Sequence, residues 1–276
     1  MSASDIGNHS SKIMILDATC KLVYQLTEPV PTIFMLRPRS GSGQWMMRED
    51  FHLHPAVPVE EFVDVYGNLC QRLVMPPGEF HVFVQYRVKV VDFVHLDAGA
   101  NFPIIPVQEL PAEVMHFLLP SRYCQSDLLQ DLALSIAGSA LHDFQQVSQI
   151  HGWIHRELDY ARDSSDTSTT ALDTARTKRG VCRDFAHLGI ALCRARNIPA
   201  RMVVGFLHGL APMDLHAWFE AFIGGRWHTF DATQPLTQGY RIVVAHGRDA
   251  ADVALATLFG NFLMTHMSVS VSEAQF

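Results

Sequence analysis

Two adjacent glycines, Gly224-Gly225, impose the strongest constraint on how this 276-residue chain can fold. They separate two strand-like runs, and a Gly-Gly loop of two residues is typical of a tight antiparallel hairpin. If these glycines form the loop, Ile223 faces Arg226, and the pairing of the two strands follows from that one pair. Because side chains alternate across a strand, His216 and Asp231 then lie on one face as diagonal neighbours. A slip of one residue would separate them.

The first part of the chain has the pattern of antiparallel β structure. The clearest strand runs over residues 80–90, where apolar and polar side chains alternate with a period of two, broken only by Phe83. We also expect strands over residues 12–25, 32–37 and 44–54, and a turn at residues 64–68. These signals predict an N-terminal antiparallel β-sandwich domain over residues 1–100.

The periodicity changes after a proline-rich stretch that begins at Leu96. Apolar residues at steps of three and four predict a helix over residues 139–158, with Ser139 as its N-cap. A second helix is expected over residues 182–196, because Asn197 suits a left-handed cap and Pro199 prevents continuation.

Strands follow at residues 200–207, 216–223 and 226–233, while the polar run 161–170 reads as a surface loop. Together these elements predict a second domain over residues 101–276, in which the helix beginning at Cys182 packs on an antiparallel sheet. The fold class is therefore α+β.

Composition excludes several functional classes. A hydrophobic fraction of 48% and a charged fraction of 18% are typical of a compact protein, and a net charge of -7 argues against a nucleic-acid partner. The sequence has neither the roughly 18 uninterrupted apolar residues of a membrane helix nor a secretory signal layout, so we expect no membrane partner and a cytoplasmic location. The five cysteines include no C-x-x-C pair, so neither a disulfide framework nor a zinc site is indicated.

Cys182 is the candidate nucleophile. It stands at the start of its predicted helix, where free backbone N–H groups and the positive end of the helix dipole stabilise an anion. Thiolates in such positions have pKa values of roughly 3.5–7.5, and the neighbouring amides are candidate donors to an oxyanion. The alternative is that Cys182 is an ordinary buried thiol, which is the more frequent fate of a cysteine.

His216 and Asp231 complete a possible catalytic triad, in which the histidine takes the proton of the thiol and the aspartate orients the histidine. Taken singly, His216 could be a hydrogen-bonded core residue and Asp231 a cap at a strand end. Their expected proximity, together with a cysteine at a helix start, favours the triad.

Three short segments resemble the motif blocks of the transglutaminase-like superfamily, relatives of papain-type cysteine proteases. They are G-V-C-R-D-F-A-H from Gly180, H-A-W-F-E from His216 and D-A-T-Q from Asp231. D-V-Y-G-N from Asp64, P-S-R-Y-C from Pro120, T-S-T-T-A-L-D-T from Thr167 and A-H-G-R-D-A-A-D-V from Ala245 extend the resemblance over most of the chain, in the manner of bacterial members with a β N-terminal domain. The resemblance implies a papain-like core with Cys182 as nucleophile, His216 as base and Asp231 as its orienting partner.

Three further candidate residues lie within these motifs. Asp184 is expected to stabilise the start of the nucleophile helix rather than to act in catalysis. His187, one turn further along, is a weaker candidate for a supporting role. Trp218, two residues after His216, could cover the site or fill the core, and the core is favoured.

Arg248, Asp249 and Asp252 are candidates for substrate contact, although a solvated charge cluster is the simpler interpretation. By periodicity residues 249–259 could form a short helix, whereas the resemblance implies a loop that borders the cleft. His52 and His54 share one strand face but lack a third ligand, so no metal site is predicted. No cofactor is expected.

These observations predict an enzyme that transfers acyl groups at amide bonds through a thioester on Cys182. The resemblance alone implies water as the acceptor, which would make it a cysteine hydrolase (a protease, peptidase or amidase) that acts on a peptide or protein. A cross-linking transglutaminase, with lysine as the acceptor, is the first alternative. A binding or scaffolding protein that keeps the fold without catalysis is the second. The sequence does not predict the oligomeric state.

Overall fold

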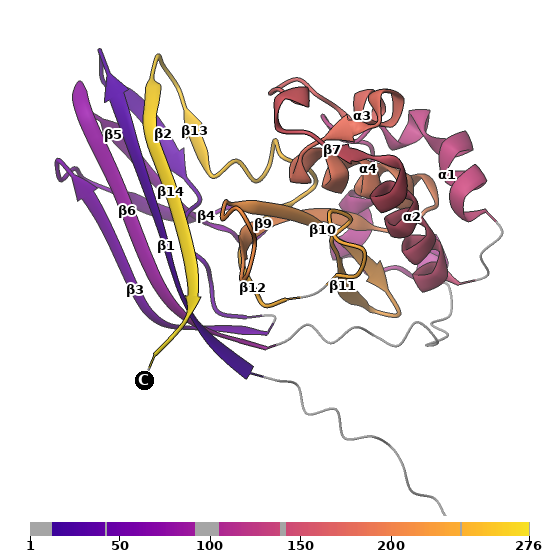
Figure 1. The fold of residues 1–276 in the computed structure, drawn as a ribbon. Helices are drawn as coiled ribbons and strands as arrows, with labels where there is room; N and C mark the ends of the chain where they lie inside the picture. The colour runs from indigo at the N-terminus through magenta and orange to yellow at the C-terminus, as the bar shows by residue number, and fades with distance from the viewer. Residues whose placement is uncertain (1–12, 42, 92–104, 139–141, 238, 276) are drawn as a thin grey trace, which may run out of the picture.

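The computed structural model describes the chain except residues 1–12, 42, 92–104, 139–141, 238 and 276 (Figure 1). The β-rich part contains β1 (Ile13–Leu26), β2 (Val30–Phe34), β3 (Gln44–His54), β4 (Glu60–Val63), β5 (Leu69–Met75), β6 (Gly78–Val91), β13 (Ala256–Leu258) and β14 (Leu263–Glu273). The rest contains α1 (Gln130–Ala137), α2 (Asp143–Glu157), β7 (Asp159–Tyr160), α3 (Ala171–Thr177), β8 (Arg179–Gly180), α4 (Cys182–Ala195), β9 (Ala200–Leu207), β10 (His216–Ile223), β11 (Arg226–Phe230) and β12 (Arg241–Gly247). Short 3-10 helices span Val107–Glu109, Ala112–Phe117, Ser126–Leu128 and Arg162–Ser164.

The N-terminal part forms two four-stranded antiparallel sheets, as the alternating sequence predicts. One has the strand order β14-β1-β6-β3 and the other β13-β2-β5-β4. Alternate side chains of β1 and β6 are fully buried, and Tyr24 of β1 contacts Phe34 of β2 across the space between the sheets, with ring centroids 6.2 Å apart. The expected turn at residues 64–68 is present, since Asp64 accepts hydrogen bonds from the backbone of Tyr66 and Asn68.

The C-terminal strands differ from the expected division of the chain at residue 100. β14 pairs with β1 and β13 pairs with β2, so both strands complete the sheets of the N-terminal part (yellow in Figure 1). The pairing of β14 with β1 joins residues about 250 positions apart, from Leu16 with Glu273 to Gln25 with Leu263. Residues 101–276 therefore do not form a unit apart from the β domain. Pairing partners so far apart leave no local signal in the sequence.

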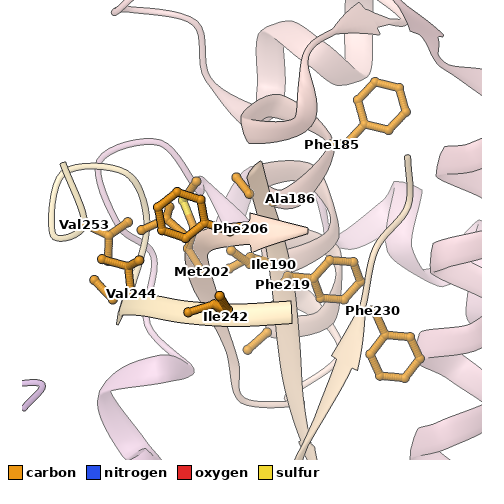
Figure 2. Close-up of a cluster of buried hydrophobic side chains, with 14 of the residues drawn as sticks. Phe185, Ala186, Ile190, Met202, Phe206, Phe219, Phe230, Ile242, Val244 and Val253 are labelled. Atoms are coloured by element: carbon orange, nitrogen blue, oxygen red, sulfur yellow. The ribbon is translucent and has the colours of Figure 1, made fainter. Parts of the chain in front are cut away.

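The second part packs helices against one antiparallel sheet of order β11-β10-β9-β12. Helix α4 lies on this sheet, and their contact forms a buried cluster that includes Ile190 of α4, Phe206 of β9 and Phe219 of β10 (Figure 2). Gly189 permits the close approach, because a Cβ there would lie 2.5 Å from the Phe219 ring. The expected packing of the nucleophile helix on an antiparallel sheet is thus present.

Two side-chain amides bind the free edge of this sheet to the β-rich part. Gln44 of β3 accepts from Val243 N–H and donates to Val243 carbonyl oxygen, both at 2.8 Å. Asn68 makes the same pair of bonds with His246, at 2.9 and 2.8 Å. Each amide replaces the neighbouring strand that an edge residue of β12 lacks, so the edge is satisfied without extending the sheet.

Two helical predictions need correction. Helix α2 begins at Asp143 with His142 as its N-cap, and Ser139 lies outside the described residues. The segment 249–259 holds a turn and strand β13 instead of a helix, in agreement with the loop that the resemblance implied. Within the described ranges, no helix combines the length and apolar character needed to span a bilayer.

Candidate active site

Cys182 is the first residue of α4, as expected. Its side chain is partly exposed, whereas the other four cysteines are buried. The Asp184 carboxylate accepts from the backbone N–H of Val181 at 2.9 Å and is itself fully buried. Asp184 therefore fixes the start of the helix that carries the thiol. Gly180 is required there, because a Cβ would lie 2.7 Å from Asp184 Cβ.

The hairpin has the predicted register. Gly224 and Gly225 form the turn with positive φ angles of 56° and 84°, and Ile223 pairs with Arg226. β10 and β11 have antiparallel partners up to Phe219 and Phe230, so Asp231 follows directly after the last pair. Strand β11 is three residues shorter than expected, and Asp231 lies at its end rather than within it.

The predicted contact between the histidine and the carboxylate is present. His216 Nε2 lies 2.8 Å from Asp231 Oδ2. The Cys182 side chain lies near enough to the imidazole to raise the proton affinity of the ring. Because Nε2 faces the carboxylate, Nδ1 is the ring nitrogen available to the thiol. His216 and Asp231 are 4% and 1% exposed, so this chain of contacts is closed to solvent except at the sulfur.

The charges of the two partners set the proton affinity of the histidine. Burial lowers the pKa of His216, but its hydrogen bonds to Asp231 and Cys182 and the negative charge of both outweigh this and raise the pKa to about 9. Burial raises the pKa of Asp231, but the bond and charge of His216 and the charge of Arg241 hold it below its usual range. A protonated imidazole beside an ionised Asp231 is the favoured state of this pair at neutral pH.

Asp231 is held by residues that sequence reasoning missed. Arg241 Nη2 donates to Asp231 Oδ2 at 3.0 Å from the first residue of β12. Two histidines one turn apart on α2 also reach this segment: His151 Nε2 lies 3.0 Å from Asp231 O, and His155 Nδ1 lies 3.2 Å from Ala232 O. Their spacing of four residues is the only sequence signal, and it is equally typical of an ordinary helix face.

Tyr160 is a further neighbour of the thiol that the sequence did not reveal. Parallel pairing of β7 and β8 places it opposite Gly180, two residues before Cys182. Burial and, after it, the nearby Cys182 raise the pKa of the Tyr160 phenol, which places its hydroxyl close to the thiol. Tyr160 is 53% exposed, so it lies at the surface beside the partly exposed thiol.

Trp218 fills the core, as favoured from the sequence. It is 1% exposed, and its ring lies 6.1 Å from the His216 ring at an interplanar angle of 30°. Its Nε1 has no hydrogen-bond partner among the described residues. Gly205 faces it, and a Cβ there would lie 3.2 Å from the indole.

The remaining candidates lie away from the thiol. His187 is fully buried, stacks on Tyr123 at 5.0 Å and accepts from Ala250 N–H at 3.1 Å. Asp249 is buried and accepts from the backbone N–H groups of Tyr123 and Ala251 at 2.8 and 2.9 Å. Their described contacts join α4, the loop after β12 and the segment around Tyr123.

Arg248 and Asp252 form an ion pair at 2.9 Å in the same loop, and Tyr66 of the β-rich part lies near enough to interact with both charges. The described contacts of this pair therefore link the loop to the β-rich part rather than to Cys182. Across the part of the chain that the structure describes, no three His, Cys, Asp or Glu side chains are arranged to hold a metal ion.

Comparisons with known proteins agree with this geometry. Residues 130–232 match the family model of the transglutaminase-like superfamily. A solved structure described as a "putative cysteine protease" from Cytophaga hutchinsonii superposes with a TM-score of 0.90 at 37% identity, covering 96% of this chain and 92% of that one.

Curated relatives match over shorter stretches. An uncharacterized protein of Mycobacterium leprae is 38% identical over 112 residues, which is 37% of this chain and 39% of that protein. The kyphoscoliosis peptidase of Mus musculus is 26% identical over 118 residues, 38% of this chain and 18% of its own length. The chain thus spans about two fifths of the mycobacterial relative and less of the mouse one. With a relative of 37% identity matched over nearly its whole length, this chain belongs to the transglutaminase-like superfamily.

Proposed function

We propose that the protein is a cysteine hydrolase that cleaves amide bonds through a thioester on Cys182. The observation that carries this proposal is the chain of contacts from a partly exposed thiol through His216 to Asp231. The family and the relatives support catalysis by a cysteine in general. The names of two relatives, a "putative cysteine protease" and the kyphoscoliosis peptidase, support water as the acceptor and a peptide or protein as the substrate.

The proposed reaction starts from a Cys182 thiolate and a protonated His216. The Cys182 thiolate attacks the amide carbon, an S–C bond forms and the carbonyl electron pair moves onto oxygen. The backbone N–H groups at the start of α4 are candidate donors to that oxyanion. As the oxyanion collapses, the C–N bond breaks and the His216 imidazolium gives its proton to the leaving nitrogen, which leaves a thioester and a neutral imidazole.

Neutral His216 then takes a proton from water, and the resulting hydroxide adds to the thioester. The S–C bond breaks, the thiolate forms again and the acid is released. Amide and water have become acid and amine, and the enzyme returns to its starting state. Asp231 stays ionised throughout, so that it orients the ring and stabilises the imidazolium in both halves.

An acyl donor that needs no knowledge of the natural substrate tests the proposal. The protein is incubated with p-nitrophenyl acetate, and mass mapping follows acetylation of each cysteine. We expect acetyl on Cys182 that is lost to water as acetate, and a fall of about a thousandfold or more in Cys182→Ser. Cys193→Ser, on the buried side of the same helix, is the matched control and should keep the wild-type rate.

The same experiment separates the alternatives when a primary amine such as cadaverine is added. Free acetate as the main product supports a hydrolase, whereas accumulation of acetyl-cadaverine would replace it by a transglutaminase. Slow acetylation spread over all five cysteines would contradict catalysis and favour a binding protein.

A further inference from the structure

Arg241 shares one oxygen atom with the histidine of the site. Its Nη2 donates to Asp231 Oδ2 at 3.0 Å, and His216 Nε2 lies 2.8 Å from the same atom. The guanidinium is 1% exposed. A buried cation at this distance from a buried carboxylate changes how much negative charge the histidine experiences.

The guanidinium is held in place by further contacts. Its Nη1 donates to Gly239 O at 2.9 Å, and its carbon lies 5.6 Å from the centre of the Trp218 ring. Gly239 has a φ of 88°, a conformation that favours glycine. This backbone conformation in the turn before β12 directs the Gly239 carbonyl oxygen toward the guanidinium. The orientation of Arg241 is therefore set independently of the carboxylate it binds.

The other carboxylate oxygen of Asp231 is also occupied. Thr233 Oγ1 donates to Oδ1 at 2.6 Å and Thr233 N–H at 3.2 Å. With Arg241 and His216 on Oδ2, the carboxylate has donors on both oxygens, which is the arrangement of an ionised group. A carboxylate fixed in this way holds the imidazole plane.

From this geometry we propose that Arg241 is a positioning residue of the site: it keeps Asp231 ionised and limits how strongly Asp231 retains the proton on His216. The imidazolium must give its proton to the leaving nitrogen, so an Asp231 without a counter-charge would bind that proton too tightly. The proposal rests on the hydrolase function above, because it concerns proton transfer by His216.

The groups around this proton come from five elements. Cys182 lies on α4, Asp231 follows β11 and Arg241 begins β12, while His151 of α2 reaches the backbone carbonyl of Asp231. Tyr160 lies beside Cys182. Among them Arg241 is the permanent cation, since a guanidinium stays charged over the whole working range of pH.

Removal of the cation should therefore raise the pH at which His216 loses its proton. A charge within about 4–6 Å shifts a pKa by about 1–3 units, and we expect about one unit in Arg241→Met. The probe is the ratio of the rates at which iodoacetate and iodoacetamide alkylate Cys182. An anionic reagent is favoured over a neutral one while the imidazolium is charged, so the ratio falls at the pH where His216 deprotonates.

Three variants make the test specific. Arg241→Gln keeps hydrogen-bond donors without the charge and should shift the midpoint upward like Arg241→Met, which covers the case in which the methionine variant does not fold. Arg241→Lys restores a cation and should recover at least half of the shift. Arg201→Met removes the cation of another buried pair in the same sheet, with Glu220 at 2.7 Å, and should leave the midpoint unchanged.

An unchanged midpoint in folded Arg241→Met or Arg241→Gln would overturn the inference while leaving the hydrolase proposal intact. An equal shift in Arg241→Lys would also overturn it, because packing rather than charge would then be the cause. If Cys182 of the wild-type protein shows no preference for iodoacetate at neutral pH, the hydrolase proposal fails and this inference falls with it.

Discussion

Two buried polar clusters border helix α4, and each contains a histidine beside an arginine. The Asp231 cluster consists of His216, Asp231, Thr233 and Arg241 and lies at the start of the helix. The Arg194 cluster consists of His187, Arg194, Tyr123, Cys124 and Asp249 and lies further along it. Both histidines are almost inaccessible to solvent, at 4% and 0% exposure. Nevertheless, the pKa of His216 is raised above the ordinary value of a histidine and that of His187 is lowered below it.

The difference comes from the partner of each ring. Burial lowers the pKa of both histidines, but the carboxylate of Asp231 and the sulfur of Cys182 raise that of His216 to about 9. The His187 ring accepts from the Ala250 N–H, and the nearby charges of Arg183 and Arg194 add to burial and lower its pKa to about 3. The charge beside a buried histidine thus determines whether its pKa is raised or lowered.

The two arginines differ in the same way. Arg241 binds a carboxylate, whereas Arg194 donates to the backbone oxygens of Leu119, Ala200 and Arg248 and to the Ser121 hydroxyl. The Arg194 cluster joins loops to the helix without holding a mobile proton. The Cys124 thiol of this cluster also keeps its proton at neutral pH, because burial raises its pKa to about 12. These differences support the proposed proton transfer at the Asp231 cluster and a packing role for the Arg194 cluster.

The largest expected effect is the difference in rate between two variants in which glutamine replaces the histidine of one cluster or of the other. His216→Gln should slow acetate release from p-nitrophenyl acetate by about 10³-fold, because an amide cannot transfer the proton. His187→Gln should leave the rate of the folded protein within about threefold and instead lower the free energy of unfolding by about 1–2 kcal/mol through the lost ring stack and altered hydrogen bond. Equal losses of rate in two folded variants would break the comparison.

The second prediction concerns stability against pH. A histidine whose pKa is about 9 in the folded state and about 6.5 unfolded stabilises the fold fully below pH 6.5 and loses this contribution as the pH rises through 9. A histidine whose folded pKa is about 3 stabilises fully above pH 6.5 and loses this contribution as the pH falls. These two histidines alone should therefore place the maximum of stability near pH 6–7, with losses of about 2–3 kcal/mol from His216 on the alkaline side and from His187 on the acidic side.

Urea unfolding between pH 4.5 and 9.5 measures this profile. His216→Gln should flatten the alkaline side alone. His187→Gln should flatten part of the acidic side, because His228 and His246 also have their pKa values lowered to about 4 by burial. A variant that flattens the opposite side would contradict the assignment of the two clusters.

The Asp231 cluster could be predicted only in part from the sequence. The Gly224-Gly225 turn fixed the hairpin, and alternation then placed His216 beside Asp231, because both signals act over a few residues. Arg241 and His151 come from elements whose arrangement depends on the packing of the whole sheet. An arginine at a strand start and a histidine on a helix carry no signal of what they will contact.

The fold shows the same limit. Strands 44–54, 200–207 and 216–223 have the predicted bounds, since alternation and turns are local. The sequence does not specify that β14 pairs with β1, because the two strands are far apart in the chain. The alternating segment from Leu263 could pair with any sheet edge. Because of this pairing, the C-terminal strands belong to the β-sandwich, which differs from the division of the chain expected at residue 100.

The smallest expected effect concerns the aromatic ring that each histidine contacts, Trp218 for His216 and Tyr123 for His187. Trp218→Phe leaves a small cavity but removes the indole N–H, which has no partner among the described residues, so the two changes offset each other and the net loss should be about 1 kcal/mol. Tyr123→Phe keeps the stack and removes only the hydroxyl bond to Thr167 O, with a loss of about 0.5–1 kcal/mol. Neither variant should change the rate of Cys182 acetylation more than about threefold, because both rings act by packing. Thermal unfolding and the acetylation rate are measured on the same samples. A fall of about thirtyfold or more in Trp218→Phe at unchanged stability would mean that this ring contacts the substrate and that the site extends further along β10 than the buried geometry indicates.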